Sequence, residues 1–392
     1  MIDFTKLLSS EPIPSTSIRY GKGCSQTRSG TRKGIGPVVV WNLTQKCNYH
    51  CKHCYANAYN QKKDLLTTQD ILKTIDDFHK SKVPVVLLSG GEPFMRNDLF
   101  EIIQALRSKN IMVSISTNGS LINEKSAVQL KNLGVNYVGI SLDGTKETHD
   151  HFRGIQHAYD DAIQGIENCQ RAGLKVGLRF TLQKKNYHEI PYIFDLMDEM
   201  NIQRICFYHL VPAGRGKEIT NAMLSHEETR KVIDSLYDYT RHMITQKNIK
   251  KEILTVTNHV DAIYLYIKSK EKDPTLSPKI LELLKRNGGN RSGIAIANID
   301  WEGNVYPDQF SRFAKVGNIK DEGFAAIWHE NNPLLLPFRD KTEHLKGKCS
   351  QCTWINICNG NLRARAYYQL DDLWAEDPAC YLTMDEIRLP LE

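Results

Sequence analysis

Six hydrophobic runs, each followed by a stretch with helical periodicity, occupy the first half of the chain. The runs cover residues 38–43, 83–88, 111–116, 137–142, 176–182 and 204–210. Because a strand followed by a crossover helix leads to a parallel neighbouring strand, this alternation predicts an α/β fold with helices outside a parallel sheet. Six units are fewer than the eight of a closed β/α barrel, so we expect a partial (β/α)6 barrel.

The patterning divides the chain into four segments. We expect an N-terminal extension over 1–36, the partial barrel over 37–220 and a helical linker over 221–289. The pattern then changes, because the run 294–299, the turn residues 300–303 and the pair 305–306 predict a β-hairpin. We therefore expect a separate C-terminal domain over 290–392.

Composition and charge exclude several classes of function. The chain has 392 residues and a formal net charge of +6, which is too small to favour a nucleic-acid partner. The N-terminal residues lack the basic and apolar regions of a signal peptide, and no window approaches the roughly 18 apolar residues of a membrane span. We expect a cytoplasmic protein with reduced thiols and no membrane partner.

Ten cysteines are present, and six of them stand in two short groups. Cys47, Cys51 and Cys54 form a C-x3-C-x2-C group directly after the first predicted strand. Clustered thiolates in a reduced protein are typical of iron–sulfur clusters or zinc. A structural zinc site needs a fourth ligand, which His50 or His53 would supply, so the spacing leaves both metals open.

The second group has a different spacing and a distant fourth member. Cys349, Cys352 and Cys358 form C-x2-C-x5-C, and Cys380 follows after 21 intervening residues. Four cysteines satisfy either zinc or a cluster. The other three, Cys24, Cys169 and Cys206, are expected to be ordinary core or loop thiols.

The first cysteine group, together with the loops that follow the predicted strands, resembles the radical S-adenosylmethionine (SAM) enzymes. Residues 89–93, Ser-Gly-Gly-Glu-Pro, follow the second strand and are similar to that family's GGEP motif. The resemblance implies a [4Fe-4S] cluster on Cys47, Cys51 and Cys54, with SAM bound at the iron that has no cysteine. One electron, from a reductant such as ferredoxin or flavodoxin, would cleave SAM to methionine and a 5′-deoxyadenosyl radical.

The same resemblance implies the SAM contacts one residue at a time. Gly90 and Gly91 would let the backbone approach the ligand closely, and Glu92 would accept a hydrogen bond from the SAM ammonium. The family's motif aromatic usually precedes the last cysteine, whereas here His53 holds that place and Tyr55 follows. The remaining implied contacts are Tyr55 itself, Asn118, Ser141 and Asp143 near the ribose, Arg179 at the SAM carboxylate, and Val211 near the adenine.

The C-terminal hairpin and second cysteine group resemble the SPASM/Twitch extensions of this family. A full SPASM domain holds two auxiliary clusters, but Asp308 stands where a cysteine is usual, and Leu362 replaces another. We therefore expect a single auxiliary [4Fe-4S] cluster on Cys349, Cys352, Cys358 and Cys380.

Segments 209–216, 361–366 and 374–382 resemble the tetrapyrrole side-chain enzymes of alternative haem and haem d1 biosynthesis. This resemblance implies removal of acetate side chains from 12,18-didecarboxysiroheme, which gives Fe-coproporphyrin III. Because arginine binds carboxylates bidentately, the candidate substrate residues are Arg19, Arg215, Arg363 and Arg365. His209, at a strand end, is a candidate acid/base residue or axial iron ligand.

Three alternative functions stay open from the sequence. Removal of propionates, as in haem d1 biosynthesis, is an alternative within the same family. A SPASM-type peptide-modifying maturase is a second, although the roughly 36 residues before the first strand are too few for the winged-helix domain that such enzymes often carry. A non-catalytic iron–sulfur electron carrier is a third, but such a protein has no use for a SAM pocket.

Overall fold

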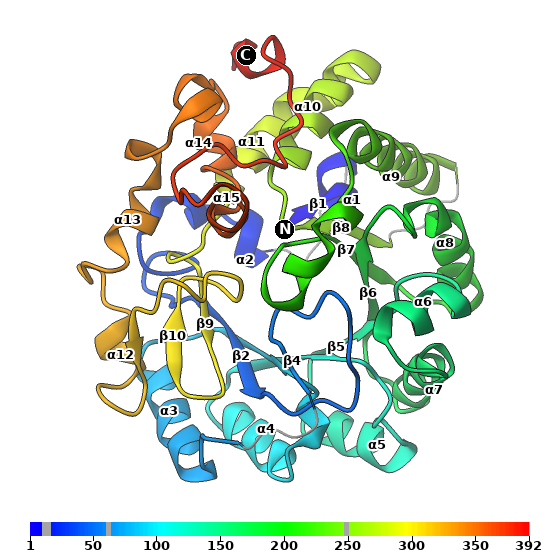
Figure 1. Cartoon of the computed structure of the whole chain (residues 1–392), viewed down its shortest axis with the longest axis vertical. Helices are drawn as coiled ribbons and strands as arrows, with labels where there is room; N and C mark the ends of the chain where they lie inside the picture. The colour runs from blue at the N-terminus through cyan, green and yellow to red at the C-terminus, as the bar shows by residue number, and fades with distance from the viewer. Residues whose placement is uncertain (10–16, 60–63, 247–250, 392) are drawn as a thin grey trace.

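Six parallel strands in chain order form the centre of the molecule (Figure 1). The computed structural model describes residues 1–9, 17–59, 64–246 and 251–391, so residues 10–16 of the predicted N-terminal extension lie outside it. Each strand pairs in parallel with the next. This confirms the expected α/β partial barrel. The strands are β2 (Val38–Thr44), β3 (Val85–Gly90), β4 (Met112–Thr117), β5 (Tyr137–Ser141), β6 (Val176–Leu182) and β7 (Arg204–His209).

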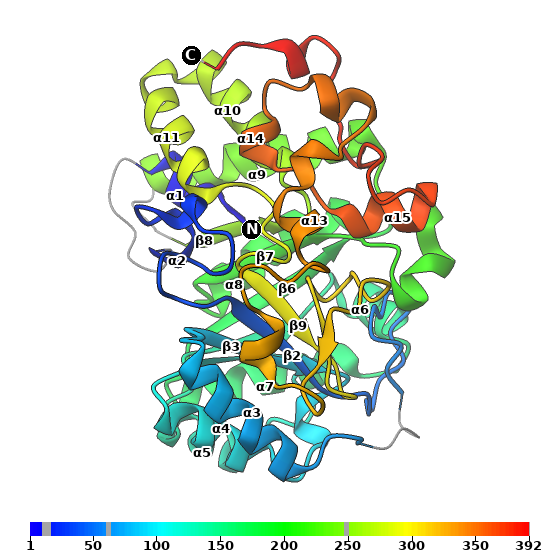
Figure 2. The ribbon, with the colours of Figure 1, turned by 90° about the vertical axis from the view of Figure 1, so that its left-hand side faces the viewer.

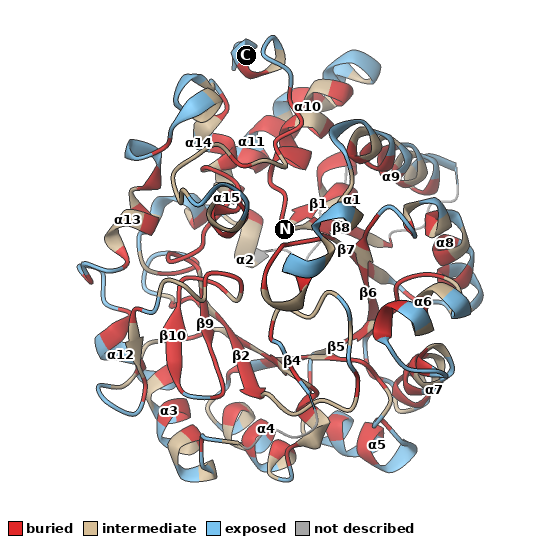
Figure 3. Ribbon diagram, in the orientation of Figure 1, coloured by how far each residue is buried: buried red, intermediate tan, exposed pale blue. Residues whose placement is uncertain are grey.

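Helices cover the outer face of this sheet, and their apolar sides are buried against it (Figure 3). Local capping also stabilises a helix of this layer, because the Thr67 and Asp70 side chains form a capping box at the start of α3. The helices of this layer are α3 (Thr68–Lys80), α4 (Leu99–Ser108), α5 (Glu124–Asn132), α6 (Lys146–Arg153), α7 (Ala158–Arg171) and α8 (Ile190–Glu199).

Aromatic contacts show which strand residues face the helices. Trp41 of β2 packs edge-on against Phe78 of α3, and Phe207 of β7 packs against Phe194 of α8. Because side chains alternate along a strand, Asn42 and Tyr208 face the opposite side, which is the interior of the barrel.

The sheet continues beyond the six strands on the β7 side. β8 (Glu252–Val256) pairs in parallel with β7, and β1 (Ile2–Asp3) pairs antiparallel with β8. The sequence predicts only a helical linker here, because β8 is a five-residue strand beside Lys-rich segments. The helices near this edge are α1 (Phe4–Leu8), α2 (Ser17–Tyr20), α9 (His226–Gln246), α10 (Val260–Lys272) and α11 (Ser277–Asn287).

The predicted C-terminal hairpin is present, and it extends the same sheet on the β2 side (Figure 2). β9 (Ile296–Ile299) pairs in parallel with β2, and β10 (Asn304–Tyr306) and β11 (Gly317–Asn318) follow in antiparallel order. Short helices complete the C-terminal part: α12 (Phe324–Ile327), α13 (Leu336–Arg339), α14 (Ile355–Cys358) and α15 (Arg363–Leu370). Within the described residues, no helix has the length and apolarity needed to cross a bilayer.

Candidate active site

The loop that follows β2 carries Cys47, Cys51 and Cys54, and the Gly-Gly-Glu turn after β3 packs against its start. The Gly91 amide donates to the Thr44 carbonyl at 2.7 Å, and the Glu92 amide donates to the Lys46 carbonyl at 2.8 Å. A Cβ on Gly91 would lie 1.9 Å from the Lys46 carbonyl oxygen. The close approach that requires this glycine is therefore to the cysteine loop.

Arg215 holds the other side of the cysteine loop. Its Nε donates to the Cys51 carbonyl at 2.8 Å, and its Nη1 donates to the Ala58 carbonyl at 3.0 Å. Its own amide donates to the Cys54 carbonyl at 3.0 Å. Arg215 was predicted as a substrate residue, but the structure shows it bound to the backbone that presents the cysteines.

The Glu92 side chain is buried and bonded to the two loops beside it. It accepts hydrogen bonds from the Thr117 hydroxyl at 2.8 Å, the Asn118 amide at 2.9 Å and the Phe94 amide at 3.2 Å. Burial raises the pKa of this carboxyl to about 7, and these three donors oppose the shift. The Asn118 side chain in turn donates to Asn48 Oδ1 at 2.9 Å, next to Cys47. Glu92 and Asn118 thus connect the predicted SAM segments to the cysteine loop.

Asp143 acts on the cysteine loop through a residue that the sequence analysis missed. Asp143 is fully buried, accepts from the Thr181 amide at 2.7 Å and forms an ion pair with Arg153 at the end of α6. The Nη1 of Arg153 lies 3.7 Å from the Cys51 sulfur, within donating distance. No motif or spacing in the sequence marks Arg153, because its role depends on how α6 packs beneath the loop.

Two further predicted SAM contacts lie on the inner side of the barrel. The Tyr55 hydroxyl accepts from Asn42 Nδ2 at 2.9 Å, and the Tyr55 ring packs edge-on against Phe310. Arg179 donates from Nη1 to the Tyr208 hydroxyl at 2.6 Å. The structure therefore brings Tyr55, from the loop after β2, and Arg179, from β6, to the same inner face of the sheet.

Ser141 and Val211 occupy the ends of strands as predicted from the motifs. Ser141 is the last residue of β5 and is the register partner of Arg179. Val211 follows β7 and is buried in a small apolar cluster with Phe310 and Leu362. Both therefore lie at the edge of the sheet where the cysteine loop begins.

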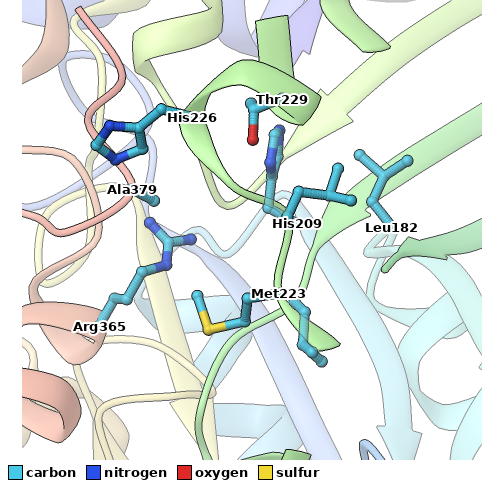
Figure 4. Close-up of a pocket in the computed structure, with 9 residues that line it drawn as sticks. Leu182, His209, Met223, His226, Thr229, Arg365 and Ala379 are labelled. Atoms are coloured by element: carbon cyan, nitrogen blue, oxygen red, sulfur yellow. The ribbon is translucent and has the colours of Figure 1, made fainter. Parts of the chain in front are cut away.

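His209 lies at the end of β7, but its ring is on the helix-facing side. Its Nε2 is 2.9 Å from Asp261 Oδ2, and the Tyr381 hydroxyl donates to Asp261 Oδ1 at 2.9 Å. Figure 4 shows the ring in a pocket between β7, the start of α9 and the C-terminal part. The pocket is lined by Leu182, His209, Leu210, Met223, Leu224, His226, Thr229, Arg365 and Ala379. Since Tyr208 faces the barrel interior, His209 points away from it.

The remaining predicted substrate arginines differ in their surroundings. Arg365 is fully buried, pairs with both Asp377 oxygens at 3.0 and 2.8 Å and donates to the Thr257 carbonyl. Arg363 is also buried and donates to the Ala375 carbonyl at 2.6 Å. Both therefore stabilise the C-terminal part. Arg19 of α2 is half-buried, and no ion pair joins it to another described residue.

The second cysteine group forms one pocket with apolar walls. Cys349, Cys352, Cys358 and Cys380 line it together with residues that include Val260, Ile263 and Leu382. Burial raises the pKa of the Cys358 thiol well above its ordinary value, so ligation by a metal centre is what would deprotonate it. Among the described residues, no three His, Cys, Asp or Glu side chains are arranged to hold a single metal ion. Four thiols around one apolar pocket match the donor set of a cluster, in which each thiolate binds a different iron.

The two departures from the SPASM pattern are ordinary structural residues here. Asp308 accepts from the Phe310 and Ser311 amides at 2.8 and 2.9 Å, and Leu362 is in the apolar cluster with Val211. This arrangement agrees with a single auxiliary cluster.

Comparisons with known proteins identify the family. Residues 41–197 match the radical SAM superfamily, and residues 293–353 match an iron–sulfur cluster-binding domain of the SPASM type. The chain belongs to the radical SAM superfamily. It therefore uses a SAM-binding iron–sulfur cluster and carries an auxiliary cluster in its C-terminal part.

Similar proteins of known function or structure cover most of the chain. An Fe-coproporphyrin III synthase of Methanosarcina barkeri is 44% identical over 99% of both chains. A pre-heme d1 synthase of Dinoroseobacter shibae is 39% identical, covering 89% of this chain and 87% of that protein. The crystal structure of Streptococcus suis SuiB with a precursor peptide superposes with a TM-score of 0.71 over 89% of this chain and 76% of that one. At 20% identity, this last match shows the shared fold.

Proposed function

We propose that this enzyme removes acetate side chains from 12,18-didecarboxysiroheme to give Fe-coproporphyrin III. The observation that carries the proposal is the 44% identity to an Fe-coproporphyrin III synthase over 99% of both chains. The single auxiliary-cluster pocket and the intact loops around Glu92 support it, because they supply the parts that such an enzyme needs.

We propose that Cys47, Cys51 and Cys54 hold the SAM-binding cluster and that Cys349, Cys352, Cys358 and Cys380 hold the auxiliary one. When bound, the first cluster and SAM supply the 5′-deoxyadenosyl radical that abstracts a substrate hydrogen. The protein residues position these groups. Arg153 places a guanidinium at Cys51, Arg215 fixes the loop backbone, and Glu92 presents a carboxylate at the strand ends.

The electron is proposed to come from a small one-electron donor such as ferredoxin or flavodoxin. SAM cleavage consumes one electron per radical, which an external one-electron donor would supply. The mildly basic chain, with a net charge of +6, is compatible with an acidic donor.

An anaerobic assay tests the proposal in two stages. Reconstituted enzyme with dithionite and SAM should form 5′-deoxyadenosine, and the Cys51→Ala variant should form none while it retains the auxiliary cluster. Addition of 12,18-didecarboxysiroheme should then yield Fe-coproporphyrin III, identified by mass.

The other outcomes of this assay select the alternatives. Loss of propionates in place of acetates would favour a pre-heme d1 synthase activity. 5′-Deoxyadenosine formation with an unchanged tetrapyrrole would favour a peptide substrate. No SAM cleavage with any reductant would favour an electron carrier.

A further inference from the structure

Three aromatic side chains from the C-terminal part form a half-buried cluster. Phe313 comes from the loop between β10 and β11, and Tyr367 and Tyr368 come from α15. Phe313 and Tyr367 stack with their ring centroids 3.8 Å apart, and Tyr368 packs edge-on against Phe313 at 5.7 Å. All three residues keep part of their surface exposed. This aromatic cluster therefore offers an apolar surface to a ligand.

The aromatic cluster adjoins the cysteine loop. Phe313 and Tyr368 pack on the same small apolar cluster as Tyr55, which directly follows Cys54. The Tyr368 hydroxyl donates to the Phe310 carbonyl at 3.0 Å, and the Phe310 ring packs edge-on against Tyr55. The half-exposed rings thus lie beside the loop that is proposed to hold the SAM-binding cluster.

Arg312 precedes Phe313, and its guanidinium has hydrogen-bond donors that are not used. Its Nε and Nη2 are buried without a partner, and its side chain is 20% exposed. The guanidinium lies over the Trp301 ring, 4.3 Å from the centroid, and Trp301 packs against Cys47 and Cys54. Since buried donors in folded proteins are almost always paired, the unused donors of Arg312 indicate a contact with a group from outside the chain.

Asp300 is the carboxylate beside Arg312, and it is bonded to other donors. Its Oδ2 is 3.9 Å from Arg312 Nη1, which is beyond hydrogen-bond distance. Its Oδ1 accepts from the Glu302 and Asn304 amides at 2.9 and 3.0 Å, and its Oδ2 accepts from the Tyr306 hydroxyl at 3.0 Å. Asp300 therefore balances the charge of Arg312 but leaves its hydrogen-bond donors open.

Lys217 adds a second cation at the aromatic cluster. Its ammonium lies over the Tyr368 ring, 4.3 Å from the centroid, and the residue is exposed. Two carboxylates stand nearby in these two loops. Asp308 is bonded to backbone amides of its own loop, and Glu218 is exposed to solvent.

We propose that the macrocycle of the tetrapyrrole substrate lies against the rings of Phe313, Tyr367 and Tyr368, and that Arg312 binds one of its peripheral carboxylates. This inference rests on the proposed function for the identity of the ligand. A flat conjugated ring system stacks on aromatic side chains, and a guanidinium is suited to hydrogen-bond a carboxylate. Because Trp301 contacts both Arg312 and the cysteine loop, this position keeps the ligand next to that loop.

Two variants separate the carboxylate contact from the ring contact. The probe is Fe-coproporphyrin III, titrated into the reconstituted enzyme under anaerobic conditions, and the comparison ligand is its tetramethyl ester. We expect Arg312→Gln to weaken binding of the tetra-acid about tenfold and to leave binding of the ester unchanged. Tyr367→Leu removes one ring and should weaken binding of both ligands about fivefold.

Matched controls lie on the outer helices. Arg107→Gln changes a half-buried arginine of α4 that donates to the Ile111 carbonyl. Tyr239→Leu changes a half-buried ring of α9 that stacks on Phe194 with the centroids 3.5 Å apart. Both controls should bind the two ligands as the parent does. Tyr367→Trp keeps an aromatic ring, so it should recover the affinity that Tyr367→Leu loses.

Three results would overturn the inference. The first is parent affinity of Arg312→Gln for the tetra-acid, or equal weakening for the acid and the ester. The second is parent affinity of Tyr367→Leu for both ligands, or no recovery in Tyr367→Trp. The third is slower 5′-deoxyadenosine formation without tetrapyrrole, which would show that these residues act through the cysteine loop; the expected rate is that of the parent.

The failure of the proposed function gives a different result. If the parent enzyme binds neither the porphyrin nor its ester, the tetrapyrrole function is overturned, and this assignment with it. If the parent binds both ligands and the two variants bind them equally well, only the assignment of the aromatic cluster and Arg312 is overturned.

Discussion

At the scale of single residues, buried and half-buried charged side chains fix the position of the cysteine loop. Arg153 bridges Asp143 and the Cys51 sulfur, whereas Arg215 binds the carbonyls of Cys51 and Ala58. A buried charge without a partner is costly, so the Asp143 and Arg153 side chains depend on each other. The loop is therefore held by charge pairing and hydrogen bonds from neighbouring loops and helices.

Replacing Arg153 with Gln should make the SAM-binding cluster harder to reduce. The variant loses a positive charge and a donor near the Cys51 sulfur, and such groups stabilise the reduced, more negative cluster. The midpoint potential should fall by on the order of 50 mV, which is about tenfold in the equilibrium for one electron. An EPR-monitored redox titration measures this shift.

The controls for Arg153 separate charge from structure. Arg153→Lys retains the charge and should shift the potential less, and Arg171→Gln at the half-exposed end of α7 should not shift it. A parent-like potential in Arg153→Gln would show that the guanidinium does not act on the cluster.

Replacing His209 with Gln should affect stability more than SAM cleavage. The ring is buried, bonded to Asp261 and directed away from the barrel interior. The free energy of unfolding should fall by about 1–3 kcal/mol, and 5′-deoxyadenosine formation without substrate should stay near the parent rate. Asp261→Asn should not add fully to this loss in a double-mutant cycle. Lost tetrapyrrole turnover at unchanged stability would instead support the acid/base role.

At the scale of secondary-structure elements, the turns at the strand ends pack on one another. The Gly-Gly-Glu turn after β3 rests on the first residues of the cysteine loop, and Glu92 bonds the loop after β4. A change in one turn is therefore transmitted to the others.

Replacing Gly91 with Ala should displace the cysteine loop. The new Cβ would meet the Lys46 carbonyl oxygen at 1.9 Å, and that backbone cannot move without moving Cys47. The unfolding free energy should fall by about 2–3 kcal/mol, and less iron should be incorporated on reconstitution. Gly34→Ala is the control, because Gly34 has φ of 72° but no atom within 4 Å of the new Cβ. Parent-like iron content in Gly91→Ala would contradict the packing argument.

Lys341, which follows α13, should give the apoprotein a measurable pH dependence. It is fully buried, donates to the Asn290 carbonyl and side chain at 2.9 Å, and has a pKa that burial lowers from 10.5 to about 7. Between pH 7 and pH 10.5 the unfolded chain binds more protons than the folded one, so the unfolding free energy rises with pH.

Lys341→Met should remove this rise, which amounts to at most roughly 5 kcal/mol. Urea denaturation of the apoprotein at several pH values measures it. Lys346→Met changes an exposed lysine that forms a surface ion pair, so the pH dependence of its unfolding free energy should match that of the parent. If the unfolding free energy changes with pH equally in all three proteins, Lys341 keeps its ordinary proton affinity in the folded state.

At the scale of the whole molecule, the barrel and the C-terminal hairpin share one sheet. β9 pairs with β2 along Val38 to Trp41, and Phe324 of α12 packs edge-on against Phe78 of α3. The predicted boundary near residue 290 therefore separates two parts of the chain that share one sheet and pack against each other.

A chain that ends at residue 289 should aggregate. Its β2 edge would expose unpaired backbone groups and apolar side chains, which favour association with other chains. Size-exclusion chromatography with far-UV circular dichroism tests this, and the full-length apoprotein is the control. A monomeric, folded truncated protein would support the separate C-terminal domain that the sequence analysis predicted.

Much of this architecture could be predicted because its signals are local. The runs 137–142 and 176–182 became β5 and β6 with at most one residue of difference. The hairpin around residues 300–303 was also recognisable, because turn residues stand between two short apolar runs. β8 was missed, since its apolar run is short and directly follows a Lys-rich segment, and its place in the sheet depends on pairing with β7 and β1.

The sequence by itself determined the cysteine spacing, the order of the loops and the absence of two SPASM cysteines, because these are properties of residue order. Only the tertiary structure decided which side chains meet. It put Arg153 at Cys51 and directed His209 away from the barrel interior, and it placed Arg312 over Trp301. Such contacts join residues from different strands and helices, and they form when the sheet closes and its helices pack against it.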